Sequence, residues 1–347
     1  MELPLDQLRA LAATVSAGTL DGAARVLHVT PSAVSQRLKA LETATGRVLL
    51  VRSKPVQVTA SGRTLLRLAR QVELLTADAA AELGEGGVAV LPIAVNADSL
   101  ATWVLPALAP LAGELAFDLH REDQEHTSEL LRGGSVMAAV TADADPVPGC
   151  SVTRLGAMRY RPMATAAFAA RWFPDGTTVD ALERAPVVVF DRKDDLQHGY
   201  LRSRGVDPAT PPVHFVPASA DYVTAVRLGF GWGMVPTQQE PPGELVGLDP
   251  TGAVDVVLHW QQWKLRSPAL DRVADAVRAA ARSELDQSEL DHSELDQGGE
   301  VLLRREAAPP SPPAAGPPAR SATPAPPRGW RAPSAGTPAA LRSSPRR

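Results

Sequence analysis

The stretch that most constrains the fold of this chain runs from residue 23 to residue 42, AARVLHVTPSAVSQRLKALE. Its spacing of small and apolar side chains predicts two short helices joined by a tight turn at residues 28–30. Thr30 can cap the second helix through its hydroxyl, and Pro31 suits the first helical position, where the missing N–H leaves no bond unmade. The stretch therefore predicts a helix-turn-helix.

The second of these helices separates its side chains into two faces. Val34, Leu38 and Leu41 share the inner face at helical spacing. The polar side chains that face outward are Ser32, Ser35, Gln36 and Lys39. In a helix-turn-helix, such residues enter the major groove and lie against base edges. An ordinary helical hairpin with a solvated polar face is the alternative that this stretch alone leaves open.

The flanking sequence favours DNA binding. Residues 48–59, VLLVRSKPVQVT, predict two short strands around a turn, forming a wing with Arg52 and Lys54 at its tip. Residues 1–70 contain ten Lys and Arg against four Asp and Glu, whereas the whole chain has a formal net charge of -4. Basic charge confined to one end is typical of a DNA-reading module on a body that does not bind DNA. Residues 1–62 are therefore expected to form a winged helix-turn-helix domain.

A long helix is expected next, from residue 61 to residue 83. The apolar side chains that recur along it at intervals of three and four are Leu65, Leu68, Val72, Leu75 and Ala79. A winged domain of this size has no surface to cover so long a seam, which favours a dimerising linker helix over a helix packed on its own domain. Glycines within residues 84–87 then predict a hinge, so residues 63–86 form the expected linker segment.

Beyond residue 88, short apolar strands alternate with helices, which is typical of parallel α/β units. The first set is expected as strands at 91–95, 115–119 and 135–141 and helices at 99–111 and 127–132. A second set is expected over 160–236, followed by an antiparallel strand at 254–260 and a closing helix at 269–281. Two α/β subdomains joined by crossing strands give a periplasmic-binding-protein-like effector domain over residues 87–282. Such a fold indicates ligand binding in a cleft, but not which ligand.

Several strings of the sequence are similar to a known family. LDGAARVLHVTPSAVSQRLKALE, followed by LLVRS and TASG, resembles the DNA-binding domain of LysR-type transcriptional regulators. LPIAVNADSLATWVLPALAP, APVVVFDRKDD and LHWQQW resemble the ArgP/LysG branch of that family, whose members respond to lysine and arginine. The resemblance covers roughly residues 2–282, with the elements in the family's order.

The resemblance implies a homodimer or homotetramer whose partners are double-stranded DNA and a small-molecule effector, here a basic amino acid. It implies control of transcription of an amino acid exporter gene, and it leaves open RNA polymerase as a further partner and the choice between activation and repression. The DNA-contacting residues expected from the helix, the wing and the family are Pro31, Ser32, Ser35, Gln36, Arg37, Lys39, Arg52 and Lys54.

The anionic end of an amino acid effector is expected where the first effector-domain strand ends. Asn96, Asp98 and Ser99 follow this strand and open a helix. Backbone N–H groups and the helix dipole attract an anion at such a position, and an amino acid carboxylate would suit it. A helix cap made by Asp98 or Ser99 is the alternative.

The cationic end of the effector requires carboxylates. Glu122, Asp123 and Glu125 follow the second strand in one acidic loop, and they would suit the positive end of lysine or arginine. If the strand runs that far, alternation sends Glu122 and Asp123 to opposite faces, so only one of them is expected to reach the ligand. Asp123 is the preferred candidate, with Glu125 second. The resemblance adds Asp191, at the end of the matching VVVFD strand. A merely solvated acidic loop is the alternative.

An enzyme is the main alternative from another class, beside a small-molecule-binding α/β protein that reads no DNA. Neither GxSxG, nor a Gly-rich phosphate loop, nor HExxH occurs in the sequence. The only cysteine, Cys150, excludes an intrachain disulfide and a cysteine-based zinc cluster. The sequence places Cys150 in a polar connection between elements. To act as a nucleophile there, it would need His120, His126 or His214 beside it. We therefore expect binding without catalysis, cofactor or metal.

The C-terminal residues 283–347 depart from the family. SELDQ-SELDH-SELDQ is a five-residue repeat, and a period of five fits neither helix nor strand, so we expect no stable packing face beyond an acidic extension of the last helix. From residue 307 onward, twelve prolines and almost no large apolar residue predict disorder. Non-specific DNA contact and a dispensable extension are both open for this basic tail. With no apolar run of eighteen residues and no signal-peptide pattern, a cytoplasmic protein without membrane partners is expected.

Overall fold

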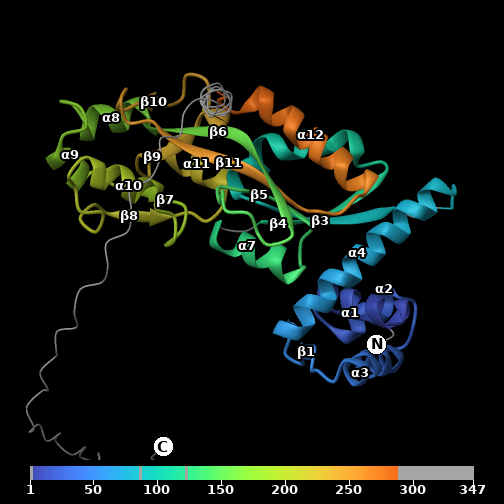
Figure 1. The fold of residues 1–347 in the computed structure, drawn as a ribbon. Coiled ribbons are helices and arrows are strands. Elements are labelled where there is room, and N and C mark those ends of the chain that lie inside the picture. The colour runs from blue at the N-terminus through green and yellow to red at the C-terminus, as the bar shows by residue number, and fades with distance from the viewer. Residues whose placement is uncertain (1–2, 86–87, 122–123, 288–347) are drawn as a thin grey trace, which may run out of the picture. The chain divides into compact units, whose positions relative to one another are not determined.

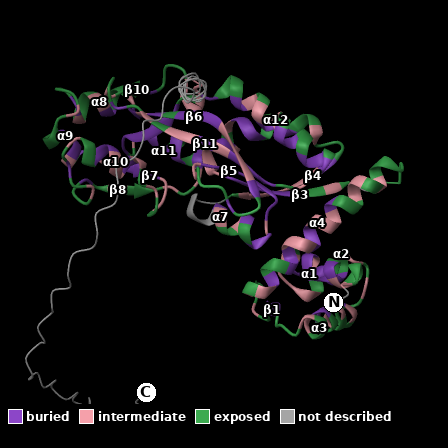
Figure 2. Ribbon diagram, in the orientation of Figure 1, coloured by how far each residue is buried: buried purple, intermediate pink, exposed green. Residues whose placement is uncertain are grey.

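The computed structural model describes residues 3–85, 88–121 and 124–287, with the side chains of 124–126 left aside. Its elements are drawn in Figure 1 and its burial in Figure 2. Among the described residues, no helix is long and apolar enough to cross a membrane.

The N-terminal domain is a bundle of three helices with a wing. The helices are α1 Leu5–Ala17, α2 Leu20–Val26 and α3 Pro31–Thr45. Thr30 caps α3 by accepting the N–H of Ala33 at 3.2 Å, as the sequence predicts. The predicted inner face is confirmed, since the buried residues of α3 are Val34, Leu38 and Leu41. They join one core with the apolar faces of α1 and α2.

The predicted wing consists of two very short strands. These are β1 Leu50–Val51 and β2 Gln57–Val58, which pair antiparallel. Thr59 then caps the next helix through the N–H of Gly62. Gly62 is required at this place, because a Cβ there would lie 2.1 Å from the carbonyl oxygen of Leu49.

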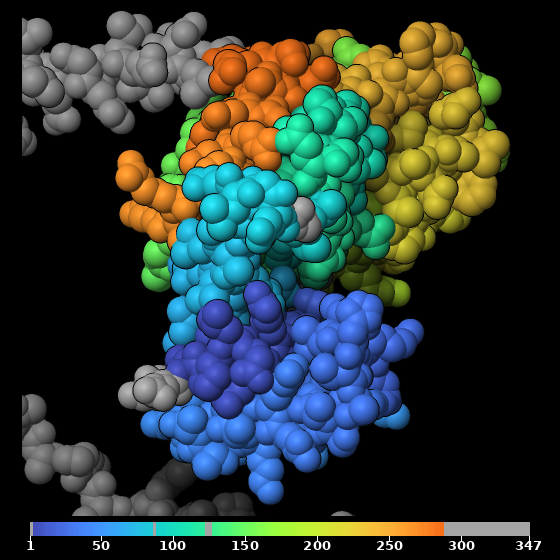
Figure 3. All heavy atoms as spheres, turned by 90° about the vertical axis from the view of Figure 1, so that its right-hand side faces the viewer, coloured from blue at the N-terminus to red at the C-terminus, as the bar shows by residue number. Residues whose placement is uncertain are grey.

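The long helix α4 spans Ala60–Glu82, close to the predicted range. In Figure 3 the chain passes from the blue winged domain into this cyan helix. In its apolar seam Leu65 is buried and Leu68 and Val72 are half-buried, whereas Leu75 is 44% exposed and the last turn is solvated. The described chain therefore leaves the C-terminal part of the seam uncovered, as a dimerising helix requires.

The first subdomain of the effector domain contains three parallel strands. They are β3 Ala89–Val95, β4 Leu115–Arg121 and β5 Ala138–Thr141, with β3 in the centre. The helix predicted at 99–111 is instead a broken helical run. Its pieces are α5 Ala97–Ser99, the π-helix Leu100–Val104, α6 Leu105–Leu108 and the 3-10 helix Ala109–Leu111. Pro106 and Pro110 lack N–H donors, which prevents one regular α-helix. Helix α7 spans Gln124–Gly133.

Two long strands cross between the subdomains. They are β6 Cys150–Ala164 and β11 Val254–Trp263, antiparallel over their whole shared length. The sequence prediction missed the first part of β6 and placed Cys150 in a polar connection. That prediction was wrong, because Cys150 begins β6 and is 3% exposed in the core. The register of the pair shifts between Leu258 and His259.

The second subdomain is built on β7 Val187–Val189, which pairs parallel with β8 Val213–Phe215. Strand β9 Gly233–Pro236 pairs antiparallel with β6, as does β10 Val246–Gly247. The helical segments of this part are α8 Ala166–Trp172, α9 Val179–Arg184, α10 Leu196–Ser203, α11 Ser219–Arg227 and the 3-10 helix Thr237–Gln239.

Helix α12, Pro268–Glu284, is the last helix of the described chain and packs against α6 and β6. It takes in the first two residues of the five-residue repeat. The expectation that the repeat has no packing face is wrong for this first copy, because Leu285 is 5% exposed within the main core. The physical reason is that Leu285 packs beside Gly156 of β6, next to a backbone bridge between Ala157 and Asp286, whereas a periodicity argument considers only the segment's own regularity.

Candidate functional site

The outer face of α3 offers polar groups to a DNA groove. Pro31, Ser32, Gln36 and Lys39 are exposed on it, and Ser35 is half-buried. The oxygens of Thr30 and Ser32 lie 2.9 Å apart, so the cap also orients the Ser32 hydroxyl. The exposed amide of Gln36 has the donor and the acceptor needed for bidentate recognition of a base edge.

Arg37 differs from the other predicted DNA contacts. Its Nε lies 3.1 Å from Asp6 Oδ2, so the guanidinium pairs with α1. Both side chains are partly exposed, and such a pair stabilises the domain only weakly. In the wing, Arg52 and Lys54 are both exposed between β1 and β2, as predicted.

A cavity of about 690 Å³ lies between the two effector subdomains. Three of the predicted effector residues, Asn96, Asp98 and Asp191, line it. Ser99 does not line it, since its side chain is fully buried. Asp123 lies outside the described residues, as does the side chain of Glu125, so both assignments stay predictions.

Asp98 is the residue at which both subdomains and a crossing strand meet. The Tyr160 hydroxyl of β6 donates to Asp98 Oδ2 at 2.7 Å, and the Ser219 hydroxyl of α11 donates to Oδ1 at 2.6 Å. Gln239 Nε2 in turn donates to Ser219 Oγ at 2.7 Å. Two hydroxyl donors therefore hold the Asp98 carboxylate in place at the cavity wall.

The segment that follows β7 supplies further carboxylates. Asp191, Asp194 and Asp195 all line the cavity. Asp191 Oδ1 accepts the backbone N–H of Lys193 at 2.8 Å and of Asp194 at 3.0 Å, so the loop folds around this side chain. Asp195 forms an ion pair with Arg202, so its negative charge is already compensated.

Asp194 is partly withdrawn from water. It accepts the N–H of Leu196 at 3.0 Å and of Phe190 at 3.3 Å. Burial raises the pKa of Asp194, and the negative charges of Asp98 and Asp191 raise it further. The charges of Asp98 and Asp191 therefore act on Asp194, and a cation placed beside Asp194 would relieve that repulsion.

Sequence reasoning missed Tyr160, Asp194 and Ser219 as parts of this site. Asp194 had a signal, since it stands three residues after Asp191 in the string DRKDD. The hydroxyls of Tyr160 and Ser219 had none, because they lie 62 and 121 residues from their partner Asp98.

The thiol chemistry left open by the sequence finds no support in the geometry. Burial raises the pKa of Cys150, so its thiol stays protonated near neutral pH. Among the suggested partners, His120 lies on β4, where its Nε2 is 3.2 Å from Asp118 Oδ2, and His214 lies on β8 against Phe230. His126 falls among the side chains outside the described set.

Comparisons with known proteins agree with both halves of this architecture. Residues 5–63 match the bacterial regulatory helix-turn-helix protein, lysR family, and residues 84–282 match the LysR substrate binding domain. The HTH-type transcriptional regulator LysG of Mycobacterium tuberculosis is 46% identical over 283 residues, which are 79% of this chain and 92% of the relative.

Two solved structures are similar over the whole described chain. The crystal structure of ArgP from Mycobacterium tuberculosis is 45% identical with a TM-score of 0.72, and the match covers 82% of this chain and 99% of that one. Full-length LysG from Corynebacterium glutamicum with bound effector Arg is 38% identical with a TM-score of 0.64, covering 82% and 100%. The chain therefore belongs to the LysR family, as a DNA-binding transcriptional regulator, not an enzyme, that is closely related to LysG and ArgP.

Proposed function

We propose that this regulator senses a basic amino acid, arginine or lysine, in the cavity between its effector subdomains. The observation that carries the proposal is the set of three carboxylates that line the cavity, Asp98 from the first subdomain and Asp191 and Asp194 from the second. The structure of the Corynebacterium relative with bound effector Arg supports the same ligand class.

The two ends of the effector meet different groups. The guanidinium or ammonium end lies among the three carboxylates, where charge-assisted hydrogen bonds are strong because the site is partly withdrawn from water. The effector carboxylate meets the backbone N–H groups at the start of the helical run that follows Asn96, whose side chain lines the cavity. In this assignment Ser99 serves packing, since it is buried behind the wall.

The effector acts by favouring one arrangement of the protein on DNA. It can shift that balance only by its different affinity for the two arrangements. Asp98 is suited to this task, because its partners Tyr160 and Ser219 come from a crossing strand and from the second subdomain. A cation bound at Asp98 therefore favours a closed arrangement of the two subdomains.

DNA is read by the exposed face of α3 and by the wing. Pro31, Ser32, Ser35 and Gln36 lie at base edges, whereas Lys39, Arg52 and Lys54 contact phosphates, and Arg37 acts partly through its pair with Asp6. The uncovered seam of α4 joins two chains into a dimer, the unit that binds a two-fold site.

The target gene encodes an amino acid exporter. Relatives in two Corynebacterium species are named lysine export transcriptional regulatory protein LysG, at 44% and 41% identity. Transcription in vitro from the chain's own operator tests the proposal. Arginine or lysine is expected to change transcript yield, whereas alanine and glutamate are not. A yield that no amino acid changes would contradict it.

A further inference from the structure

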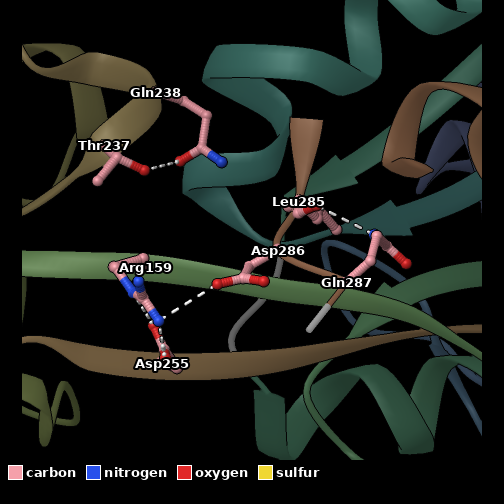
Figure 4. A network of polar contacts seen from close by, with 7 residues as sticks. All are labelled: Arg159, Thr237, Gln238, Asp255, Leu285, Asp286 and Gln287. Carbon is pink, nitrogen blue, oxygen red and sulfur yellow. Dashed lines mark hydrogen bonds and ion pairs between the residues drawn. The ribbon is translucent and has the colours of Figure 1, made fainter. Parts of the chain in front are cut away.

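Residues 155–159 of β6 hold the last three residues of the first copy of the five-residue repeat, and we call this surface the groove. Figure 4 shows Leu285, Asp286 and Gln287 beside the crossing strands. Ala157 and Asp286 exchange both backbone hydrogen bonds, each at 2.9 Å, so the segment adds a short antiparallel bridge to β6. Backbone pairing of this kind fixes the register of the docked segment.

Each side chain of the docked tripeptide has its own contact. Leu285 enters the main core of the effector domain and is 5% exposed. Asp286 Oδ2 lies 3.2 Å from Nη2 of Arg159, which also pairs with Asp255 at 2.7 and 2.8 Å. Gln287 Nε2 donates to the carbonyl of Leu155 at 2.9 Å. The groove thus recognises a leucine, an acid and a side-chain donor in that order.

Gly156 shapes the groove for a closely lying backbone. Its φ is +138°, and a Cβ at this position would lie 2.4 Å from Gln287 Nε2 and 2.8 Å from Leu285 Cβ. No residue with a side chain fits here while the tripeptide is docked. The glycine therefore belongs to the recognition of the tripeptide.

The sequence repeats the recognised side chains twice more. Residues 290–292 are Leu-Asp-His and residues 295–297 are Leu-Asp-Gln, both outside the described residues. The third copy is identical to the docked tripeptide, and the histidine of the second copy also carries an N–H donor. Every contact that the groove makes with a side chain is thus available in a later copy.

We propose that the groove is a docking site for the Leu-Asp-Gln unit and that the second and third copies of the repeat are alternative occupants of it. The exchange releases the first copy and loops out five or ten residues after α12. The first copy docks without a loop and is therefore the preferred occupant. The second and third copies loop out five and ten residues, and because this doubling of loop length costs little entropy, those two registers are close to each other in free energy. The exchange moves the point at which the basic tail leaves the effector domain.

Thermal melting of the full-length chain tests the proposal through leucine substitutions. The set consists of Leu285→Ala alone, Leu290→Ala with Leu295→Ala as the matched control, and all three together. We expect the triple variant to melt roughly 5 °C or more below the wild type. Leu285→Ala alone should lower the melting temperature by less than half of that amount. The control should melt at the same temperature as the wild type.

Two outcomes overturn the proposal. If Leu285→Ala alone costs as much as the triple variant, only the first copy docks. If the triple variant melts with the wild type, no copy contributes. Should the triple leucine variant fail to fold, the same comparison with Asp286→Asn, Asp291→Asn and Asp296→Asn decides, because the Arg159 pair is partly exposed and its loss is milder. Equal melting of the single and triple Asn variants below the wild type then counts against exchange.

Discussion

The recognition surface and the effector cavity of this regulator are assembled in different ways. The polar groups of α3 come from neighbouring turns of one helix, held by a core that one domain provides. The cavity takes its groups from the segment after β3, from β6, from the segment after β7 and from α11. A substitution on α3 is therefore expected to act alone, whereas a substitution in the cavity also disturbs residues far away in the sequence.

The separation of the two regions predicts that the core of each can be weakened by itself. Leu41 and Leu131 are both fully buried helical leucines, in the winged domain and in the effector domain. Leu41→Ala should destabilise the winged domain by about 2–5 kcal/mol and reduce DNA binding, with arginine binding unchanged. Leu131→Ala is the matched control. It should reduce arginine binding and leave DNA binding by the winged domain unchanged. Calorimetric melting and arginine titration of both variants test this separation. A single substitution that lowers the melting temperature of both domains would contradict it.

Removing the charge of Asp98 should produce the largest loss of effector affinity. Asp98→Asn keeps the shape and one carbonyl acceptor, and it should weaken arginine binding by about 1.5–3 kcal/mol, the contribution of a charged hydrogen bond. Asp195→Asn removes the same charge from the same cavity, but Asp195 is already paired with Arg202 and should matter little. Equal losses in the two variants, measured by titration calorimetry, would mean that the cavity acts only through its total charge.

Gln36→Ala should separate base reading from phosphate contact in the winged domain. If the amide reads a base, its loss weakens specific binding by about 1–3 kcal/mol and leaves binding to random DNA unchanged. Arg52→Ala should instead weaken binding to every sequence and flatten the dependence on salt. Fluorescence anisotropy with operator and random duplexes measures both, and a Gln36 loss of the same size on random DNA removes this residue from base reading.

Effector affinity should depend on pH while DNA sequence preference does not. The pKa of Asp194 is raised, chiefly by burial and then by the charges of Asp98 and Asp191. A cation favours the ionised form, so arginine binding should weaken as the pH falls through this raised pKa and should level off above it, with a slope of at most about tenfold per unit. Asp194→Asn should flatten the profile. Tighter arginine binding in acid would contradict the assigned role of Asp194.

The sequence predicted the α3 surface better than the cavity, because α3 takes its groups from one helix and the cavity takes them from distant segments. The cap at Thr30 and the buried face of α3 were predicted because helical spacing and capping are local properties. The start of β6 was not, because a buried strand that pairs over a long sequence separation carries no local period of its own.

The cavity was predicted only in part for this reason. Strand ends indicated Asn96, Asp98 and Asp191, and all three line the cavity. The hydroxyls that hold Asp98 were found only in the folded chain, since no local pattern links residues 62 and 121 positions apart. The docking of Leu285 was missed because the groove that receives it lies on β6, far away in the sequence.

Titration of the full-length chain with arginine and with citrulline tests the central claim most directly. Citrulline keeps the length and shape of arginine but replaces the charged guanidinium by a neutral urea group. If the three carboxylates read the cationic end, arginine should bind at least about tenfold more tightly than citrulline, since a charged hydrogen bond contributes about 1.5–3 kcal/mol. Citrulline that binds as tightly as arginine would contradict the claim that this regulator recognises a basic amino acid by its charge.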